Sequence, residues 1–147
     1  MEQPDDGIII EQVRPETTWQ LRRDVLYPGM MKHEMELAED PDGIHFGAYR
    51  DDKLAGVVSL FQQERSFQFR KLAVDAAVQH QGVGSALMNF IISYAATNGG
   101  HLLWCNARTN ATVFYLKFGF THSGRLFSRN NIGYEIMEKP LTPVSDR

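Results

Sequence analysis

Two glycines stand where a helical pattern begins, in the segment VQHQGVGSALMNF at residues 78–90. Glycine is among the poorest helix formers, so its presence at this point needs a reason. The start of a helix presents unpaired backbone N–H groups and a partial positive charge, and both attract phosphate. A glycine lets the backbone approach such a ligand without a Cβ in the way. We therefore expect residues 81–85 to bind an anionic group through their backbone.

Three phosphate-binding patterns can be compared with this turn. A P-loop needs Gly-Lys followed by Ser or Thr, but here Gly84 is followed directly by Ser85. A dinucleotide fingerprint needs a third glycine at the position that Leu87 occupies. The third pattern, Q/R-x-x-G-x-G/A, is matched by Gln79, Gly82 and Gly84.

The segment that matches the third pattern resembles part of a known protein family. The stretch LAVDAAVQHQGVGSALM resembles the coenzyme A-binding segment of the GNAT superfamily of N-acetyltransferases, with a KLAV strand before it and an amphipathic helix after it. Downstream, NATVFYLKFGF resembles the second landmark of the family, an Asn followed by a helix with a Tyr and a terminal GF. These positions are Asn110, Tyr115, Gly119 and Phe120. The resemblance covers about residues 54–120, and a purely structural strand–helix turn is the alternative.

The resemblance implies a role for each matching position. Backbone groups of Leu72, Ala73 and Val74 would pair with the pantetheine arm like an added strand, and the Leu72 N–H would face the thioester oxygen. The pyrophosphate would lie on the backbone of residues 81–85. The residues expected to contact the cofactor are Leu72, Ala73, Val74, Gln79, His80, Gln81, Gly82, Val83, Gly84, Ser85, Asn106, Asn110, Phe114 and Tyr115. Asn110 is one residue closer to Tyr115 than in many members, so either Asn106 or Asn110 would meet the pantetheine arm.

Acyl transfer needs a deprotonated amine, a stabilised oxyanion and a protonated leaving thiolate. A tyrosine hydroxyl is a suitable proton donor to a thiolate, so we expect Tyr115 to act as general acid, against the alternative of a core aromatic. Glu64 is the first candidate for the general base. His33 and Glu34 are the other candidates, and a water relay would need none of them. The residues Arg22 and Arg23 would border the acceptor site or lie on a solvated helix face.

Composition narrows the class of protein. The chain has 147 residues with 43% hydrophobic residues, which suits one domain with a packed core, residues 1–147, and a loose tail at 140–147. The net charge of −3 argues against a nucleic-acid-binding protein. A single cysteine, Cys105, excludes an internal disulfide, and the histidines show no ligand spacing, so no metal is expected. With no leader-like segment and no long apolar run, we expect a cytoplasmic protein that does not contact membranes.

The elements follow from periodicity and turn residues. In the strand at 66–74, Phe67 and Phe69 fall on one face, whereas Leu72 and Val74 would fall on the opposite face. This pattern predicts either a β-bulge near Arg70 or Lys71 or a strand buried on both faces. The acidic cluster at 39–42 is expected to be a solvated turn. The helix beginning at residue 83 is expected to bury Val83, Ala86, Leu87, Phe90, Ile91 and Tyr94. The remaining expected elements are a strand at 7–13, a helix at 15–27, a hairpin turning at 51–52, a strand at 101–107, a short helix ending at 119 and a closing hairpin turning at 129–133.

This order predicts a mixed α/β (α+β) chain with a parallel strand–helix–strand unit between residues 67 and 106. The resemblance implies the GNAT acyl-CoA N-acyltransferase fold, a mixed, mostly antiparallel sheet with a central bulged strand and flanking helices. It also implies an acetyl-CoA-dependent N-acetyltransferase acting on a primary amine of a small molecule or peptide, as a monomer or homodimer. The alternative function is a non-catalytic acyl-CoA-binding module, since no general base stands out.

Overall fold

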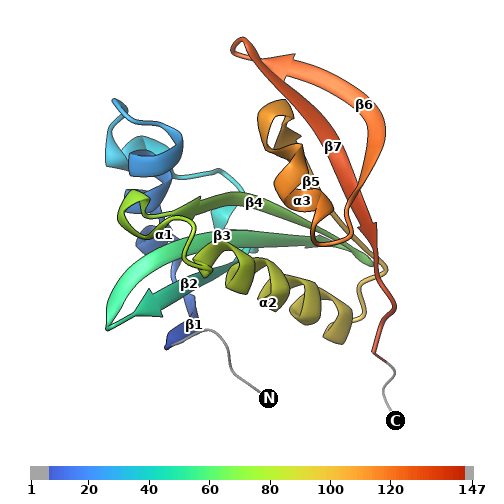
Figure 1. Ribbon diagram of the computed structural model, residues 1–147, viewed down its shortest axis with the longest axis horizontal. Coiled ribbons are helices and arrows are strands. Elements are labelled where there is room, and N and C mark those ends of the chain that lie inside the picture. Colours follow the sequence, from blue (N-terminus) through green and yellow to red (C-terminus); the bar gives the residue numbers. More distant parts are fainter. Residues whose placement is uncertain (1–6, 145–147) are drawn as a thin grey trace. The chain divides into compact units, whose positions relative to one another are not determined.

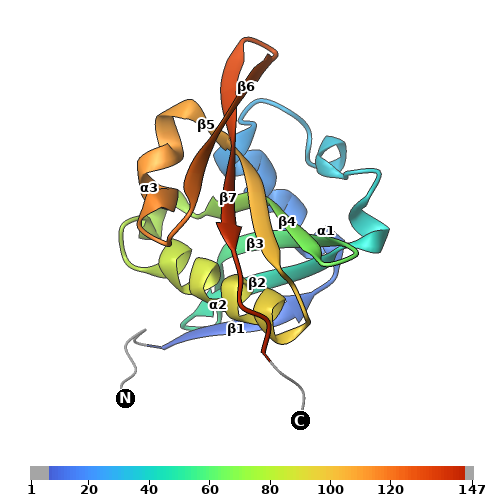
Figure 2. The same cartoon turned by 90° about the vertical axis from the view of Figure 1, so that its right-hand side faces the viewer.

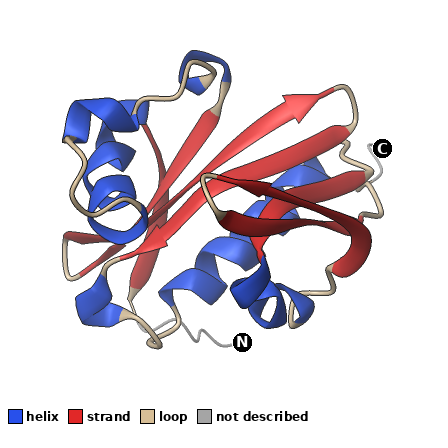
Figure 3. Cartoon of the chain, turned by 90° about the horizontal axis from the view of Figure 1, so that it is seen from above, coloured by secondary structure: helices blue, strands red, loops and turns tan. Residues whose placement is uncertain are grey.

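The computed structural model describes residues 7–144 (Figure 1). Strands make up the larger part of its regular structure (Figure 3). Over residues 7–144 the elements are β1 (Ile8–Val13), α1 (Pro15–Leu21), the π-helix η1 (Arg22–Leu26), the 3₁₀ turns η2 (Lys32–Met35) and η3 (Asp40–Asp42), β2 (Ile44–Arg50), β3 (Lys53–Gln63), β4 (Ser66–Val74), the 3₁₀ turn η4 (Ala76–Val78), α2 (Val83–Thr97), β5 (Leu102–Arg108), the 3₁₀ turn η5 (Thr109–Ala111), α3 (Thr112–Leu116), β6 (Thr121–Arg129) and β7 (Ile132–Pro140). The predicted order of strands and helices is confirmed.

The seven strands described within residues 7–144 follow the order β1-β2-β3-β4-β5-β7-β6. The pairs β1/β2, β2/β3, β5/β7 and β6/β7 are antiparallel. Strands β4 and β5 pair in parallel, with Ser66 opposite Leu102. The predicted mixed, mostly antiparallel sheet is therefore confirmed, as is the parallel strand–helix–strand unit.

The chain divides into two compact units. Unit 1 is Met1–Phe61 with Lys71–Phe90, and unit 2 is Gln62–Arg70 with Ile91–Arg147. Both β4 and α2 therefore begin in one unit and end in the other. The expectation of one N-acetyltransferase domain over residues 1–147 stays a prediction.

Unit 1 is built on the hairpin of β2 and β3. The turn residues Asp51 and Asp52 have φ angles of 52° and 64°, the left-handed pair that a two-residue hairpin turn requires. Helix α1 and η1 pack on the hairpin through a buried cluster that joins Leu21 and Val57 with Ala73 of β4. Gly47 and Gly56 lie within the hairpin strands, and Gly56 takes part in the site described below.

Unit 2 is built on β5, β7 and β6. Burial alternates strictly along β5, so Leu103, Cys105 and Ala107 share one covered face. The β6–β7 hairpin turns at Asn130 and Asn131, with φ of 54° and 65°, and its tip extends past α3 (Figure 2). After β7 the chain stays attached, because the Leu141 and Val144 N–H groups donate to the carbonyls of His101 and Ala96. Residues 145–147 of the tail predicted to be loose lie outside the described residues.

Two details of burial differ from the predicted pattern. On α2, Phe90 is 36% exposed, whereas Met88 and Ala95 are fully buried. The covered face is therefore rotated toward Met88, and Phe90 lies at its margin with its ring 5.0 Å from that of Phe46. In β4, Lys71 has a φ of 60°, a left-handed conformation at the predicted irregularity, but Ala73 is the fully buried residue and Leu72 is only half-buried.

Candidate active site

The connection from β4 to α2 adopts a conformation that demands glycine at one position. Gly82 has a φ of +91°, and a Cβ added there would meet nothing within 4 Å. Glycine is thus required by the backbone angle and not by lack of space. His80 has a φ of 67°, so two left-handed residues bend the chain immediately before the helix. Alternating left-handed and ordinary residues turn successive N–H groups to one side, which is the geometry of an anion-binding nest.

The start of α2 offers backbone N–H donors, and no acidic side chain of the first turn competes for them. The Ala86 N–H makes the first helical bond, to the Gly82 carbonyl at 2.9 Å. The N–H groups of Val83, Gly84 and Ser85 precede it and have no carbonyl one turn back. The first turn of α2 contains no acidic residue. An anion at this helix start would therefore meet free donors and the positive end of the helix dipole.

This helix start is positioned by contact with β3. A Cβ on Gly56 would lie 2.8 Å from Val83 Cγ1 and 3.0 Å from Leu87 Cδ1. Val83 and Leu87 are 1% and 0% exposed, so the first turns of α2 are pressed onto the strand at Gly56. The absence of a side chain at Gly56 sets how closely the helix approaches, which fixes the position of its N-terminus.

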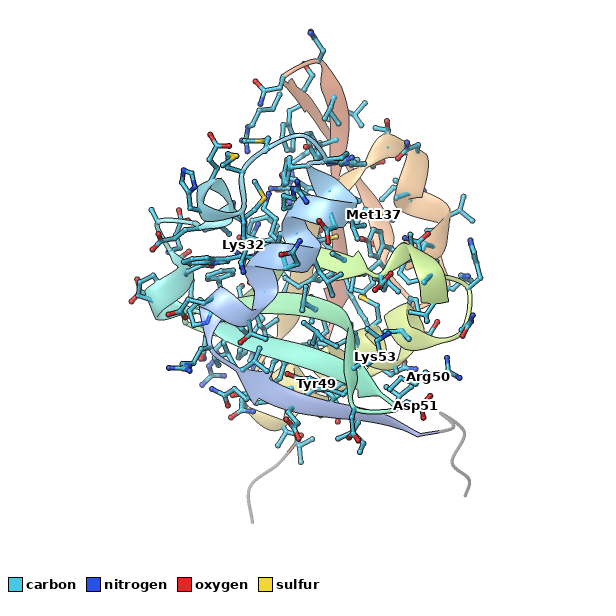
Figure 4. The ribbon with its side chains drawn as sticks, turned by 90° about the vertical axis from the view of Figure 1, so that its left-hand side faces the viewer. Lys32, Tyr49, Arg50, Asp51, Lys53 and Met137 are labelled. Carbon is cyan, nitrogen blue, oxygen red and sulfur yellow. The ribbon has the colours of Figure 1, made fainter. Side chains whose placement is uncertain are left out.

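Two side-chain hydrogen bonds brace the loop. Gln79 Nε2 donates to the Val74 carbonyl at 3.0 Å, so this glutamine ties the loop to the end of β4. Arg50 Nη1 donates to Gln81 Oε1 at 2.9 Å from the end of β2, beside Asp51 and Lys53 (Figure 4). Arg50 was not among the sequence candidates, because nothing in the spacing of residues 50 and 81 indicates that they meet. Its guanidinium gives the loop a positive charge.

A diphosphate such as that of coenzyme A fits this loop by chemistry. The loop supplies backbone donors at a helix start, open space at Gly82 and the nearby cation of Arg50. The residues available to hold the diphosphate are Gln81, Gly82, Val83, Gly84 and Ser85, with His80 exposed beside them. All of them belong to unit 1, as do Leu72, Ala73 and Val74.

Tyr115 lies in unit 2 within an aromatic cluster. Its ring centroid is 5.5 Å from that of Phe69, 5.2 Å from that of Phe114 and 6.1 Å from that of Phe120. Burial, with a smaller effect of Cys105, raises the pKa of the phenol above its ordinary value, and Arg108 opposes the shift. Among residues 7–144 the Tyr115 hydroxyl has no hydrogen-bond partner. The phenol is therefore protonated at neutral pH, and its hydroxyl is available to a ligand.

The two asparagine candidates differ in setting. Asn106 is half-buried in β5, opposite Ile136 of β7, whereas Asn110 is exposed in η5. Neither side-chain amide has a partner among the residues that the structure describes. Asn106 shares its rigid strand with Cys105, and Asn110 precedes the first turn of α3.

The candidates for a general base are all exposed side chains. Glu64 lies exposed in the turn between β3 and β4, with a φ of 57°, and its carbonyl accepts a hydrogen bond from Gln62 Nε2. At about 3.3 Å per residue, Glu64 is ~16 Å along the chain from Phe69, whose ring contacts Tyr115. His33 is exposed, and Glu34 Oε1 accepts from the Met31 N–H, as a cap of η2 does.

The expectation of a solvated helix face is wrong for Arg22, and that of a solvated turn is wrong for Asp40, whereas Glu39 and Asp42 are exposed as expected. Arg22 is 0% exposed and binds Asp40 through two hydrogen bonds of 2.9 and 3.0 Å. It also donates to the Met35 carbonyl and to Ser59 Oγ, both at 2.9 Å. Burial would raise the pKa of the Asp40 carboxyl, but the hydrogen bonds from Arg22 and Leu37 outweigh it and hold the pKa below 3.8. The buried Arg22 is a structural anchor, because its charge needed a partner once the packing excluded water.

No group of three or more His, Cys, Asp or Glu side chains within residues 7–144 is arranged to hold a metal ion. In the same range, no helix is long and apolar enough to cross a membrane. Cys105 is 2% exposed, and burial raises the pKa of its thiol to about 12.

Comparison with known proteins assigns the family. The sequence model of the family described as "Acetyltransferase (GNAT) domain" matches residues 10–141. The chain is 25% identical over 137 residues to the uncharacterized N-acetyltransferase YitI of Bacillus subtilis, covering 87% of this chain and 92% of that protein.

Solved structures share the fold. The ribosomal-protein-S18-alanine N-acetyltransferase of Escherichia coli superposes with a TM-score of 0.77 at 16% identity, over 95% of this chain and 97% of that one. An aminoglycoside 6'-N-acetyltransferase complexed with coenzyme A gives a TM-score of 0.74 at 19% identity, over 94% and 99% of the two chains. The family match spans most of the residues of both units, so the chain belongs to the GNAT acetyltransferases and is an acetyl-CoA-dependent N-acetyltransferase.

Proposed function

We propose that this protein transfers the acetyl group of acetyl-CoA directly to a primary amine of a small molecule or peptide, with Tyr115 as general acid. The observation that carries the proposal is the Tyr115 hydroxyl, which is held in an aromatic cluster and has no hydrogen-bond partner among residues 7–144. The structural neighbours named above act on ribosomal-protein alanine and on aminoglycosides, and both acceptors are amines. We further propose that the protein is cytoplasmic, uses no metal and acts as a monomer or homodimer.

Unit 1 is proposed to bind the nucleotide end of acetyl-CoA. The N–H groups at the start of α2 and the Gly82 turn would hold the diphosphate, with Arg50 supplying a positive charge. Gln79 would act by bracing the loop on Val74 rather than by contact with the ligand. The backbone of Leu72, Ala73 and Val74 would pair with the pantetheine arm, and in unit 2 Asn106, Asn110 and Phe114 would contact it.

Acetyl-CoA supplies an acyl group activated as a thioester. In the proposed reaction the amine lone pair forms the new C–N bond while the C–S bond breaks. The Leu72 N–H would stabilise the oxyanion that develops on the carbonyl oxygen. Tyr115 would give its hydroxyl proton to the departing sulfur, the acceptor nitrogen would lose one proton to water, and Tyr115 would regain a proton from water. We prefer water to Glu64, because Glu64 is an exposed turn residue far along β4 from Phe69.

The proposal is tested by free-thiol release from acetyl-CoA in the presence of amines. Tyr115→Phe should lower kcat about 10²- to 10⁴-fold, the usual contribution of a positioned acid, and leave coenzyme A affinity nearly intact. Tyr134→Phe is the matched control, because it removes a hydroxyl from a half-buried tyrosine of unit 2 that stacks on Phe127. A Tyr115→Phe enzyme as fast as the control would remove Tyr115 from the mechanism.

The phosphate-binding loop is tested separately. Gly82→Ala should weaken coenzyme A binding about 5- to 30-fold, because a side chain at a left-handed φ costs roughly 1–2 kcal/mol. Gly124→Ala is the matched control, since Gly124 has a φ of +82° with nothing within 4 Å of an added Cβ. Equal coenzyme A affinity in the two variants would contradict the role of the loop.

A second candidate is a non-catalytic acyl-CoA-binding module. It is favoured by one observation, which is that no carboxylate or histidine among residues 7–144 is hydrogen-bonded to the Tyr115 hydroxyl. Tight coenzyme A binding with no thiol release against any amine would support this candidate.

A further inference from the structure

Lys71 is an unusual residue for the middle of a strand. It lies in β4 with a φ of 60°, and its side chain is half-buried. A left-handed conformation is rare for a residue other than Gly, Asn or Asp, and such strained positions gather at functional sites. The sequence offered one signal, the pair of charged residues Arg70 and Lys71 between the apolar residues of the run FRKLAV.

Within residues 7–144 the charge of Lys71 has no counterion. Its ammonium donates a hydrogen bond to the Tyr27 hydroxyl and lies 4.6 Å from the centroid of the Tyr27 ring. No carboxylate lies within 4.0 Å of it among residues 7–144. By contrast, Arg22 and Arg125 are paired with Asp40 and Glu138. An ammonium has three donors, and the phenol accepts one, so Lys71 retains two donors for a ligand.

Tyr27, which contacts this lysine, is itself firmly held. It follows the π-helix η1, and its N–H donates to the Arg23 carbonyl at 3.2 Å while its carbonyl accepts from the Met30 N–H at 3.1 Å. The start of η1 is Arg22, which is fixed by its buried bonds to Asp40. Single π-turns within helices are rare and recur at functional sites. The Tyr27 ring is thus a fixed support that holds the Lys71 ammonium in one place.

We propose that Lys71, positioned by Tyr27, binds a carboxylate of the acceptor, so that the substrates are primary amines that also carry a carboxylate, as amino acids do. This inference rests on the proposed function, because Lys71 adjoins Leu72, whose N–H is proposed to face the reacting carbonyl. A carboxylate can accept a charge-assisted hydrogen bond from one of the two donors that Tyr27 leaves free. Lys71 thereby determines specificity and takes no part in proton transfer.

The test compares amines that differ only in a carboxylate. Alanine with ethylamine, methionine with 3-(methylthio)propylamine and phenylalanine with 2-phenylethylamine are assayed by thiol release from acetyl-CoA. The wild-type enzyme should favour the carboxylated member of a pair about 10- to 100-fold in kcat/KM, the usual effect of a hydrogen bond to a charged group. Lys71→Met should abolish this preference by raising KM for the carboxylated member, with kcat and coenzyme A affinity nearly unchanged. Lys71→Arg should restore part of it.

Lys53→Met is the matched control, because Lys53 is an exposed lysine of unit 1 at the start of β3 (Figure 4). It should keep the full preference. Two results would overturn the inference while the proposed function stands. One is thiol release with no preference for the carboxylated amines, and the other is a preference that Lys71→Met leaves intact. A lack of thiol release with every amine would refute the proposed function, and the inference would fall with it.

Discussion

Replacing Asp40 by asparagine removes the only carboxylate that pairs with Arg22 among the described residues. The two side chains are 0% and 2% exposed, so the guanidinium would remain buried without a counterion. The new amide NH₂ would face an Arg22 N–H, which places a donor against a donor. Removing one partner of a buried ion pair typically costs about 3–5 kcal/mol. An ordinary domain is stable by only about 5–15 kcal/mol, so Asp40→Asn should lose a large part of its stability.

The assay is urea unfolding of Asp40→Asn and of Asp42→Asn, which carries the same change two residues away at an exposed position. A thermal scan should show the midpoint of Asp40→Asn lowered by roughly 6–20 °C, at about 2–4 °C per kcal/mol for a chain of this size. Asp42→Asn should shift by less than about 0.5 kcal/mol, as surface substitutions do. Equal stability of the two variants would refute the reasoning that Arg22 is a buried anchor.

The same comparison has a defined pH dependence. The pKa of Asp40 is lower in the folded protein than its ordinary 3.8. Its contribution to stability is therefore complete above about pH 4 and is lost as the pH falls through the folded-state value. The stability gap between wild type and Asp40→Asn should narrow only below about pH 4. A gap that narrows between pH 6 and 8 would mean that another group controls it.

Three further predictions concern residues around the proposed site. Cys105 should not react with a thiol reagent at pH 8 in the folded protein and should react fully in urea, because its pKa is raised to about 12; stoichiometric labelling of the native protein would contradict its burial. Glu64→Gln should change kcat less than twofold with an unaltered pH profile, and a large loss with a shifted acidic limb would make Glu64 the base. Gly56→Ala should weaken coenzyme A binding several-fold, because the added methyl would lie 2.8 Å from Val83 Cγ1 and displace α2; unchanged affinity would mean that the helix start tolerates a shift.

Most of the fold could be predicted because local chemistry determines it. The Asp51-Asp52 and Asn130-Asn131 pairs are turn residues that tolerate left-handed angles, and both hairpins turn there. The strand–glycine–helix segment likewise specifies its own shape, since Gly82 occupies a φ of +91° that few other residues adopt. These features involve neighbours in sequence, so periodicity and turn chemistry are sufficient.

The residues that sequence reasoning missed depend on distant contacts. Arg50 meets Gln81 across 31 positions, and Arg22 meets Asp40 across 18. Sequence spacing carries no signal for such pairs, so Arg22 was expected at a solvated face or an acceptor site. The burial of Met88 in place of Phe90 also depends on which neighbour α2 packs against. Lys71 was one of the two positions expected for the β-bulge. Its contact with Tyr27 could not be predicted, because the two residues meet only in the tertiary structure.

Free-thiol release from acetyl-CoA, measured with and without an amine acceptor, tests the central claim most directly. Direct transfer predicts no release, and no initial burst, when the enzyme is mixed with acetyl-CoA alone. With a suitable amine it predicts one thiol released for each amine acetylated, at a rate that Tyr115→Phe lowers sharply. A burst equal to the enzyme concentration without an amine would indicate an acyl-enzyme, and no release with any amine despite tight coenzyme A binding would indicate a binding module. Either result would contradict the proposal that this protein acetylates amines by direct transfer.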